Sequence, residues 1–220
     1  MDALGCEGLL FDLDGVLIDS SACVTRHWRQ WADRHNLDLT SVMRIAHGVR
    51  TIETMRALAP ELDAEREAAA FARGELADTE GIVALDGAQP LLHSLPADRW
   101  GIVTSASRAL ARARLRQAGL SLPSVMVCSD DVQRGKPAPE PYLEGARRLG
   151  RRPSRCIAVE DAPAGIESAR AAGMQVVGIA STHSRRSLVC PLVADRLSEL
   201  RVEERPGREP RLWVSIVSQG

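Results

Sequence analysis

Several polar side chains that could act on an anionic group follow four short apolar runs of this 220-residue chain. They are two aspartates, a threonine–serine pair, a lysine and a glutamate–aspartate pair, namely Asp12, Asp14, Thr104, Ser105, Lys136, Glu160 and Asp161. Taken one at a time, each side chain is also typical of a helix cap, a turn or a solvated loop. Open α/β sheets bind ligands beyond the carboxyl ends of their strands, so we expect all of these side chains to meet in one crevice.

The carboxylates of this crevice require a cation, because two like charges about 4 Å apart repel by about 4 kcal/mol at an effective dielectric constant of about 20. Oxygen ligands without His or Cys favour a hard cation, and Mg²⁺ fits because it prefers few carboxylates together with substrate phosphate. The hydroxyls of Thr104 and Ser105, the amides at the following helix start and Lys136 are the donors that a phosphoryl group needs. An aspartate beside the metal can attack phosphorus, and water can hydrolyse the aspartyl phosphate.

Five short apolar runs are predicted to be the strands that position these residues: residues 8–14, 100–106, 124–131, 155–162 and 175–182. Their continuous apolar character is typical of strands buried on both faces of a parallel sheet. Helical patterns lie between the runs, and Gly119, Gly150 and Gly173 are plausible helix stops. Strands that alternate with helices indicate right-handed βαβ units in an α/β core with a Rossmann-like, doubly wound parallel sheet.

The segment between the first and second predicted strands is too long for one crossover and consists of successive helical patterns. Residues 17–82 are therefore predicted to form an all-helical domain, which we call the cap. It is inserted into an α/β catalytic core made of residues 1–16 and 83–220. Trp28 and Trp31 lie three residues apart on one helical face, and we expect them in the core of the cap.

Composition and charge exclude several classes of protein. The chain is 45% hydrophobic and 26% charged, which is typical of a globular protein. Its 28 basic and 29 acidic residues give a formal charge of −1, without the basic excess that binds nucleic acid. No apolar run reaches the length of about eighteen residues that a membrane span needs, and the N-terminus lacks the positive charge of a signal peptide. We expect a cytoplasmic protein without nucleic-acid or membrane partners.

Two further features concern the cysteines and the C-terminal region. The five cysteines are scattered and include no C-x-x-C pair, which argues against a disulfide framework and a zinc site. Cys23 and Cys190 are expected to be the most exposed thiols. The alternating apolar residues Leu212, Val214 and Ile216 follow a Pro-Gly turn and predict a terminal hairpin.

The motifs together resemble those of the haloacid dehalogenase superfamily, and the helical insert is similar to the cap of its phosphoglucomutase-like branch. They are, in order, Asp12-Leu-Asp14-Gly-Val, Thr104-Ser105, Lys136-Pro137 and Glu160-Asp161. The resemblance covers nearly the whole chain, and its second aspartate in the first motif is that of phosphatases and mutases rather than dehalogenases. It implies that Asp12 attacks phosphorus and that Asp14 protonates the leaving oxygen and then activates water. It also implies Mg²⁺ on Asp12, the Asp14 backbone carbonyl and Asp161, with Glu160 as a ligand or just outside.

The resemblance also separates members of this branch. Its mutases carry a histidine twelve residues after the nucleophile, where this chain has Val24. The segment 46–51 resembles the substrate-facing loop of sugar and glycerol phosphate phosphatases, so we expect His47 and Arg50 to contact the substrate. We therefore expect a phosphoric monoester hydrolase for a small phosphorylated polyol or sugar, such as glycerol phosphate or a hexose phosphate. The alternatives are a hexose-phosphate mutase and a protein that only binds a phosphorylated ligand. A monomer is expected, with a weak dimer as the alternative.

Overall fold

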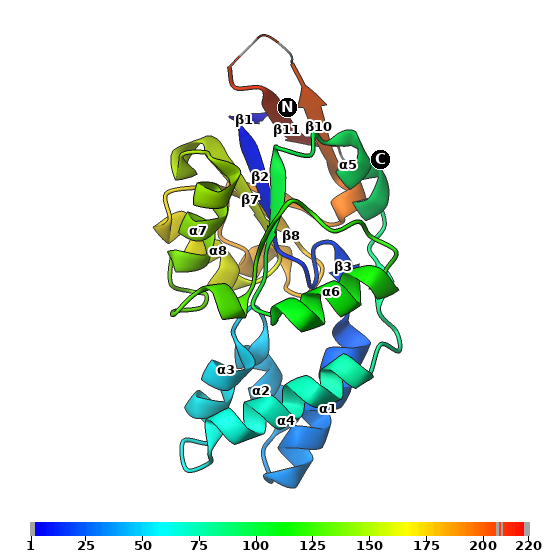
Figure 1. Ribbon diagram of the computed structural model, residues 1–220, viewed down its shortest axis with the longest axis vertical. Coiled ribbons are helices and arrows are strands. Elements are labelled where there is room, and N and C mark those ends of the chain that lie inside the picture. Colours follow the sequence, from blue (N-terminus) through cyan, green and yellow to red (C-terminus); the bar gives the residue numbers. More distant parts are fainter. Residues whose placement is uncertain (1–2, 206, 208, 218–220) are drawn as a thin grey trace.

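The computed structural model describes residues 3–205, 207 and 209–217, and a parallel six-stranded sheet lies at its centre (Figure 1). In spatial order the strands are β6 (Val125–Val127), β5 (Trp100–Val103), β2 (Gly8–Phe11), β7 (Cys156–Glu160), β8 (Gln175–Ile179) and β9 (Leu192–Ala194). From β2 the chain adds β5 and β6 on one side and then β7, β8 and β9 on the other. The predicted doubly wound α/β fold is confirmed, and β9 extends it by a strand that the sequence did not predict.

Helices cover both faces of this sheet, which explains the continuous apolar runs of its strands (Figure 1). The covering helices are α5 (Ala88–Ser94), α6 (Arg108–Gln117), α7 (Glu140–Leu149) and α8 (Pro163–Ala171). Leu9 and Phe11 of β2 pack in the cluster that contains buried residues of α5 and α6. Leu10, between them, packs in the cluster that contains α7 and α8. Short 3₁₀ turns complete the connections: η1 (Ser129–Asp131), η2 (Pro153–Arg155), η3 (Arg185–Ser187) and η4 (Leu197–Glu199).

Four helices form a separate layer below the carboxyl ends of the strands (Figure 1). They are α1 (Ser21–Arg34), α2 (Leu39–Ala46), α3 (Thr51–Leu58) and α4 (Ala64–Ala77). Asp38 and Asp63 begin α2 and α4 by accepting hydrogen bonds from backbone amides three residues later. Trp28, Trp31 and Phe71 are buried in a hydrophobic core that belongs to these helices alone, as predicted for the two tryptophans.

The helical layer joins the core through a two-stranded antiparallel ribbon. Its strands are β3 (Ile18–Asp19), which precedes α1, and β4 (Val83–Ala84), which follows α4. Because both crossings of the chain pair with each other, the helices leave and re-enter the core at one place.

A second sheet lies at the far end of the core (Figure 1). It contains the predicted terminal hairpin, β10 (Leu200–Glu204) and β11 (Leu212–Ile216), and also β1 (Leu4–Cys6), which pairs with β11. All five cysteines are free. The expectation that Cys23 is exposed is wrong, because it packs against the core cluster, whereas Cys190 is half-buried. Within the described residues no helix is long and apolar enough to cross a membrane.

Candidate active site

Lys136 is the centre of a buried ionic cluster at the carboxyl ends of the strands. Its Nζ donates to Asp12 Oδ1 and to Glu160 Oε1, both at 2.6 Å, and to the Val103 carbonyl at 3.0 Å. These acceptors lie on or directly after β2, β7 and β5. Lys136 is 1% exposed and Glu160 is 0% exposed. The lysine therefore ties three adjacent strands together and fixes the position of the Asp12 carboxylate.

Glu160 supports this cluster from behind. Its Oε1 also accepts a hydrogen bond from the Tyr142 hydroxyl at 2.6 Å, and its Oε2 accepts one from the Asp161 amide at 3.3 Å. Gly165 makes room for the carboxyl group, since a Cβ there would stand 2.0 Å from it. All of these partners of Glu160 are protein groups. Glu160 therefore positions Lys136 and is not one of the residues that line the cavity described below.

Three carboxylates lie close together around the single ammonium of Lys136, which pairs with two of them, Asp12 and Glu160. Those of Asp12, Glu160 and Asp161 have ligand oxygens within 4.8 Å of one another, and all three residues are buried. Burial raises the pKa of Asp12 to about 7 even though Lys136 favours the ionised form. Burial, with the charges of Asp12 and Glu160, also raises the pKa of Asp161 well above its usual range. The excess of negative charge over one lysine fits a divalent cation bound by oxygen ligands.

Asp161 and Gly15 define the place where such a cation fits. The Asp161 side chain accepts a hydrogen bond from the Thr182 hydroxyl through Oδ2. Gly15 has a positive φ of 82°, and a Cβ there would lie 2.0 Å from the same oxygen. The sharp turn after Asp14 and the close approach of Asp161 thus both depend on glycine.

Thr104 and Ser105 follow β5 and line the same cavity. Thr104 is buried, and its hydroxyl oxygen accepts a hydrogen bond from the Ala106 amide at 3.1 Å. Ser105 Oγ donates to the carbonyl of Gly48 in the cap at 2.8 Å. Ser107 begins α6 by accepting from the Leu110 amide. The predicted hydroxyl pair therefore reaches the crevice, and Ser105 also contacts the cap.

A cavity of about 360 Å³ lies between the strand ends and the cap. Its lining includes catalytic-motif residues of the core and several side chains of the cap: Asp12, Asp14, Thr104, Ser105, Asp161, Val24, Trp28, His47, Arg50 and Glu75. The volume suits a small ligand, and the lining is mainly polar toward the core and mainly apolar on the cap helices. The structure thus places the two parts of the predicted site around one space.

His47 and Arg50 occupy the loop between α2 and α3, which contacts the core. Arg50 pairs with Glu53, and its Nη1 and Nη2 donate to the core carbonyls of Val132 at 3.4 Å and Gln133 at 2.9 Å. The His47 ring lies edge-on to His183, 5.3 Å away, and burial lowers the pKa of His47. Both residues line the cavity as predicted, but the guanidinium of Arg50 is largely engaged in fastening the loop to the core.

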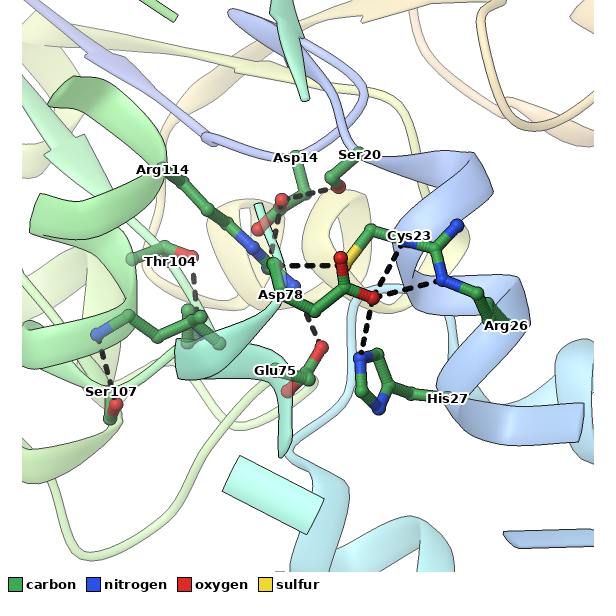
Figure 2. A network of polar contacts seen from close by, with 12 residues as sticks. Asp14, Ser20, Cys23, Arg26, His27, Glu75, Asp78, Thr104, Ser107 and Arg114 are labelled. Carbon is green, nitrogen blue, oxygen red and sulfur yellow. Dashed lines mark hydrogen bonds and ion pairs between the residues drawn. The ribbon is translucent and has the colours of Figure 1, made fainter. Parts of the chain in front are cut away.

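Two site residues were missed by the sequence analysis, Arg114 on α6 and Glu75 on α4 (Figure 2). Arg114 donates to Asp14 Oδ1 at 2.9 Å and to Glu75 Oε1 at 2.7 Å. Burial raises the pKa of Glu75. A signal did exist: Arg114 lies three and four residues after Ala111 and Leu110, on the apolar face of its helix, where an arginine needs buried acidic partners.

Comparison with known proteins finds a family match, two related enzymes and a similar solved structure. The family described as haloacid dehalogenase-like hydrolase matches residues 6–173. Hexitol phosphatase A of Escherichia coli (strain K12) is 43% identical over 91% of this chain and 96% of its own length. Glycerol-1-phosphate phosphohydrolase 1 of Saccharomyces cerevisiae is 33% identical over 92% and 87%. The crystal structure of a β-phosphoglucomutase from Clostridium difficile, 25% identical, superposes with a TM-score of 0.79 over 89% and 93% of the two chains.

Proposed function

Because this chain belongs to the haloacid dehalogenase-like hydrolases, we propose that it is a Mg²⁺-dependent phosphatase for a small phosphorylated polyol or sugar. The predicted family and the predicted class of phosphoric monoester hydrolase are confirmed by relatives that are phosphatases. The observation that carries the proposal is the buried cluster of Asp12, Glu160 and Asp161, in which Lys136 pairs with the first two, beside a cavity that Asp12 and Asp161 line.

In the proposed reaction Asp12 is the nucleophile. Lys136 holds its Oδ1, so the other carboxylate oxygen is the one available to attack phosphorus. Asp12, Asp161 and the backbone carbonyl of Asp14 would hold Mg²⁺, which when bound would neutralise charge on the phosphoryl group. The hydroxyls of Thr104 and Ser105 would bind the phosphoryl oxygens. Lys136, which was predicted to bind phosphate, has its three N–H donors on Asp12, Glu160 and Val103, so it would act by holding Asp12 in place and by its positive charge. Asp14 would give its proton to the leaving oxygen and later accept one from the attacking water.

The cap end of the cavity favours a neutral, hydroxylated leaving group. Glu75 brings a carboxylate, and only its Oε1 is bonded to Arg114. Arg114 is paired with two carboxylates, and Arg50 with Glu53 and core carbonyls. A second phosphate or a carboxylate on the substrate would meet little uncompensated positive charge here, whereas hydroxyl groups can donate to Glu75.

A hexose-phosphate mutase is the second candidate, favoured by the structural likeness to a β-phosphoglucomutase. Val24 lines the cavity at the position where mutases of the branch carry histidine. A mutase must also hold a bisphosphate, which the charges around Glu75 oppose. These two observations place the phosphatase first.

The predicted domain division belongs to this proposal. Residues 17–82 would act as a cap that closes on the core of residues 1–16 and 83–220, turning about the β3–β4 ribbon. Closure would exclude water during phosphoryl transfer. The monomeric state and the cytoplasmic location stay predictions.

A panel of phosphomonoesters tests the proposal. Phosphate release from glycerol phosphates, hexitol phosphates and hexose phosphates is measured with and without Mg²⁺, with phosphoglycolate as the anionic comparison. We expect Mg²⁺-dependent release that is fastest for a polyol or sugar phosphate. Interconversion of hexose phosphates without phosphate release would instead identify the mutase, and release from none of the panel would contradict both.

A further inference from the structure

Arg114 joins two groups that lie far apart in sequence and in different layers of the molecule (Figure 2). Its Nη1 is 2.9 Å from Asp14 Oδ1 in the core, and its Nη2 is 2.7 Å from Glu75 Oε1 in the cap. Arg114 is 3% exposed and Glu75 is 6% exposed. A guanidinium is a rigid planar fork, so these contacts fix the Asp14 carboxyl group relative to the cap.

The contacts of Asp14 are unequal at its two oxygens. Oδ1 accepts from Arg114 and also from Ser20 Oγ at 2.6 Å. Oδ2 has no hydrogen-bond partner among the described residues, and Asp14 lines the cavity. A carboxyl group that is held by one oxygen presents the other at a defined position, which proton transfer to a bound substrate requires.

We propose that Arg114 is a positioning residue: it orients Asp14 for proton transfer, and it does so fully only when Glu75 of the closed cap holds the other arm of its guanidinium. The inference rests on the proposed function. In the first step an Asp12 oxygen bonds to phosphorus, the bond from phosphorus to the leaving oxygen breaks, and that oxygen takes the Asp14 proton. In the second step water bonds to phosphorus and gives a proton to Asp14, and phosphate leaves as the Asp12–phosphorus bond breaks.

Glu75 makes the orientation of Asp14 depend on the cap. If Arg114 only connected α6 to α4, its contact with Glu75 would be enough. Arg114 also donates a hydrogen bond to Asp14 through its other terminal nitrogen. Its Nε is buried without a partner among the described residues, so the guanidinium already makes fewer hydrogen bonds than it can. Moving Glu75 away would remove the second arm's partner as well. Opening the cap would therefore leave Arg114 held by Asp14 alone, and closing it would add the second contact that fixes the plane of the guanidinium.

The test compares two leaving groups. The value of kcat/KM for glycerol phosphate depends on protonation of a poor alkoxide leaving group, whereas p-nitrophenyl phosphate has a leaving group that needs little help. Because kcat/KM reports only the steps through the first irreversible one, it isolates the role of Asp14 as acid. For Arg114→Met we expect a loss of about 30-fold or more on glycerol phosphate and of under about 3-fold on p-nitrophenyl phosphate. Arg116→Met, an exposed change on the same helix, is the matched control and should change neither.

The variant Asp14→Asn tests whether Arg114 acts through Asp14. If Arg114 acts through Asp14, the double variant Asp14→Asn, Arg114→Met should be no slower on glycerol phosphate than Asp14→Asn alone, within about 2-fold. Equal losses on the two substrates, or additive losses in the double variant, would overturn the inference. Circular dichroism and thermal melting check the folding of each variant.

Glu75→Gln and Arg114→Lys keep the test available if Arg114→Met does not fold. Glu75→Gln leaves Arg114 on Asp14 but weakens the hold from the cap, and we expect a loss of about 5-fold, again confined to glycerol phosphate. Because Glu75 also lines the cavity, the variant is repeated in Asp14→Asn, where the loss should shrink to within about 2-fold if Glu75 acts through Asp14 and persist if it only binds the substrate. Arg114→Lys keeps the charge and loses the fork, so it should show the same substrate selectivity. Loss of selectivity in both variants would overturn the inference while wild-type activity still supported the proposed phosphatase. An inactive wild type would overturn both.

Discussion

The two ends of the cavity are built differently. At one end, which we call the rigid end because it stands on the central sheet, Asp12 lines the cavity and pairs with Lys136, which also pairs with Glu160 behind it. All three residues are buried, and Asp12 and Glu160 lie just after β2 and on β7. At the cap end, His47 and Arg50 belong to a loop that reaches the core through contacts with its surface. Under the proposed mechanism, this difference assigns the chemistry to residues held by the sheet and the choice of leaving group to the cap.

The largest loss is expected from Asp12→Asn, which removes the proposed nucleophile at the rigid end. Phosphate release should fall by at least about 10³-fold on every substrate, because no other described side chain occupies the position of Asp12 beside Lys136. Steady-state phosphate release measures it. Asp33→Asn, an exposed change on α1, is the control and should retain full activity. A substantial rate for the Asp12 variant would contradict covalent catalysis.

The same cluster predicts how stability depends on pH. Burial raises the pKa of Asp12 from 3.8 to about 7, so between these values the folded protein binds more protons than the unfolded chain. The contribution of Asp12 to the free energy of unfolding of the metal-free protein should therefore fall as pH rises from about 4 to 7, by on the order of a few kcal/mol. Urea titrations across this range in chelator measure the effect.

Two further measurements of stability against pH, one with Mg²⁺ and one with Asp12→Asn, test the same cluster. Bound Mg²⁺ favours the ionised carboxylates, so saturating metal should remove most of the decline. Asp12→Asn should reduce the decline in the metal-free protein, because the titrating group is gone. The same pH dependence in metal-free wild type and metal-free Asp12→Asn would contradict the predicted electrostatics of the cluster.

Asp161→Ala should raise the Mg²⁺ concentration required for half-maximal activity by at least about 10-fold, because it removes one of the proposed ligands. A metal titration of phosphate release measures the shift. Thr182→Val, which removes only the hydroxyl that contacts Asp161, should give a smaller shift in the same direction. An unchanged requirement in Asp161→Ala would remove this residue from the metal site.

The sequence predicted the rigid end of the site better than the cap end. Asp12 and Asp161 follow short, continuous apolar runs, and strand ends of a parallel sheet converge by topology alone. The contact between Arg114 and Glu75 depends on how the helical layer packs against the core, and no local sequence pattern encodes that packing. Burial of Cys23 depends likewise on packing between the layers.

Some strands could likewise be predicted from the sequence, and others could not. The terminal hairpin has an alternating pattern and a turn, so it could be predicted. Strands β1 and β9 contain three residues each, which is too short for a periodic signal. Their existence depends on long-range pairing with β11 and β8.

The smallest effects are expected at the cap loop. Arg50→Ala removes the hydrogen bonds to the carbonyls of Val132 and Gln133, and His47→Ala removes a side chain from the cavity wall. Each change should lower kcat/KM for the preferred polyol or sugar phosphate by about 10-fold, equivalent to about 1.4 kcal/mol. Turnover of p-nitrophenyl phosphate should fall much less, because its leaving group needs little help from a closed cap.

Arg56→Ala is the matched control for Arg50→Ala, since Arg56 lies on α3, the helix that follows Arg50, pairs with Glu65 within the cap and does not line the cavity. It should leave both substrates unaffected. Equal losses on the two substrates for Arg50→Ala would mean that this arginine is needed for folding or for the chemical step. The comparison between the two ends of the cavity would then fail, because a cap residue would act like a residue of the rigid end. No loss on either substrate would mean that the loop is only a surface contact, and that recognition of the leaving group falls to Glu75 and the apolar wall around Trp28.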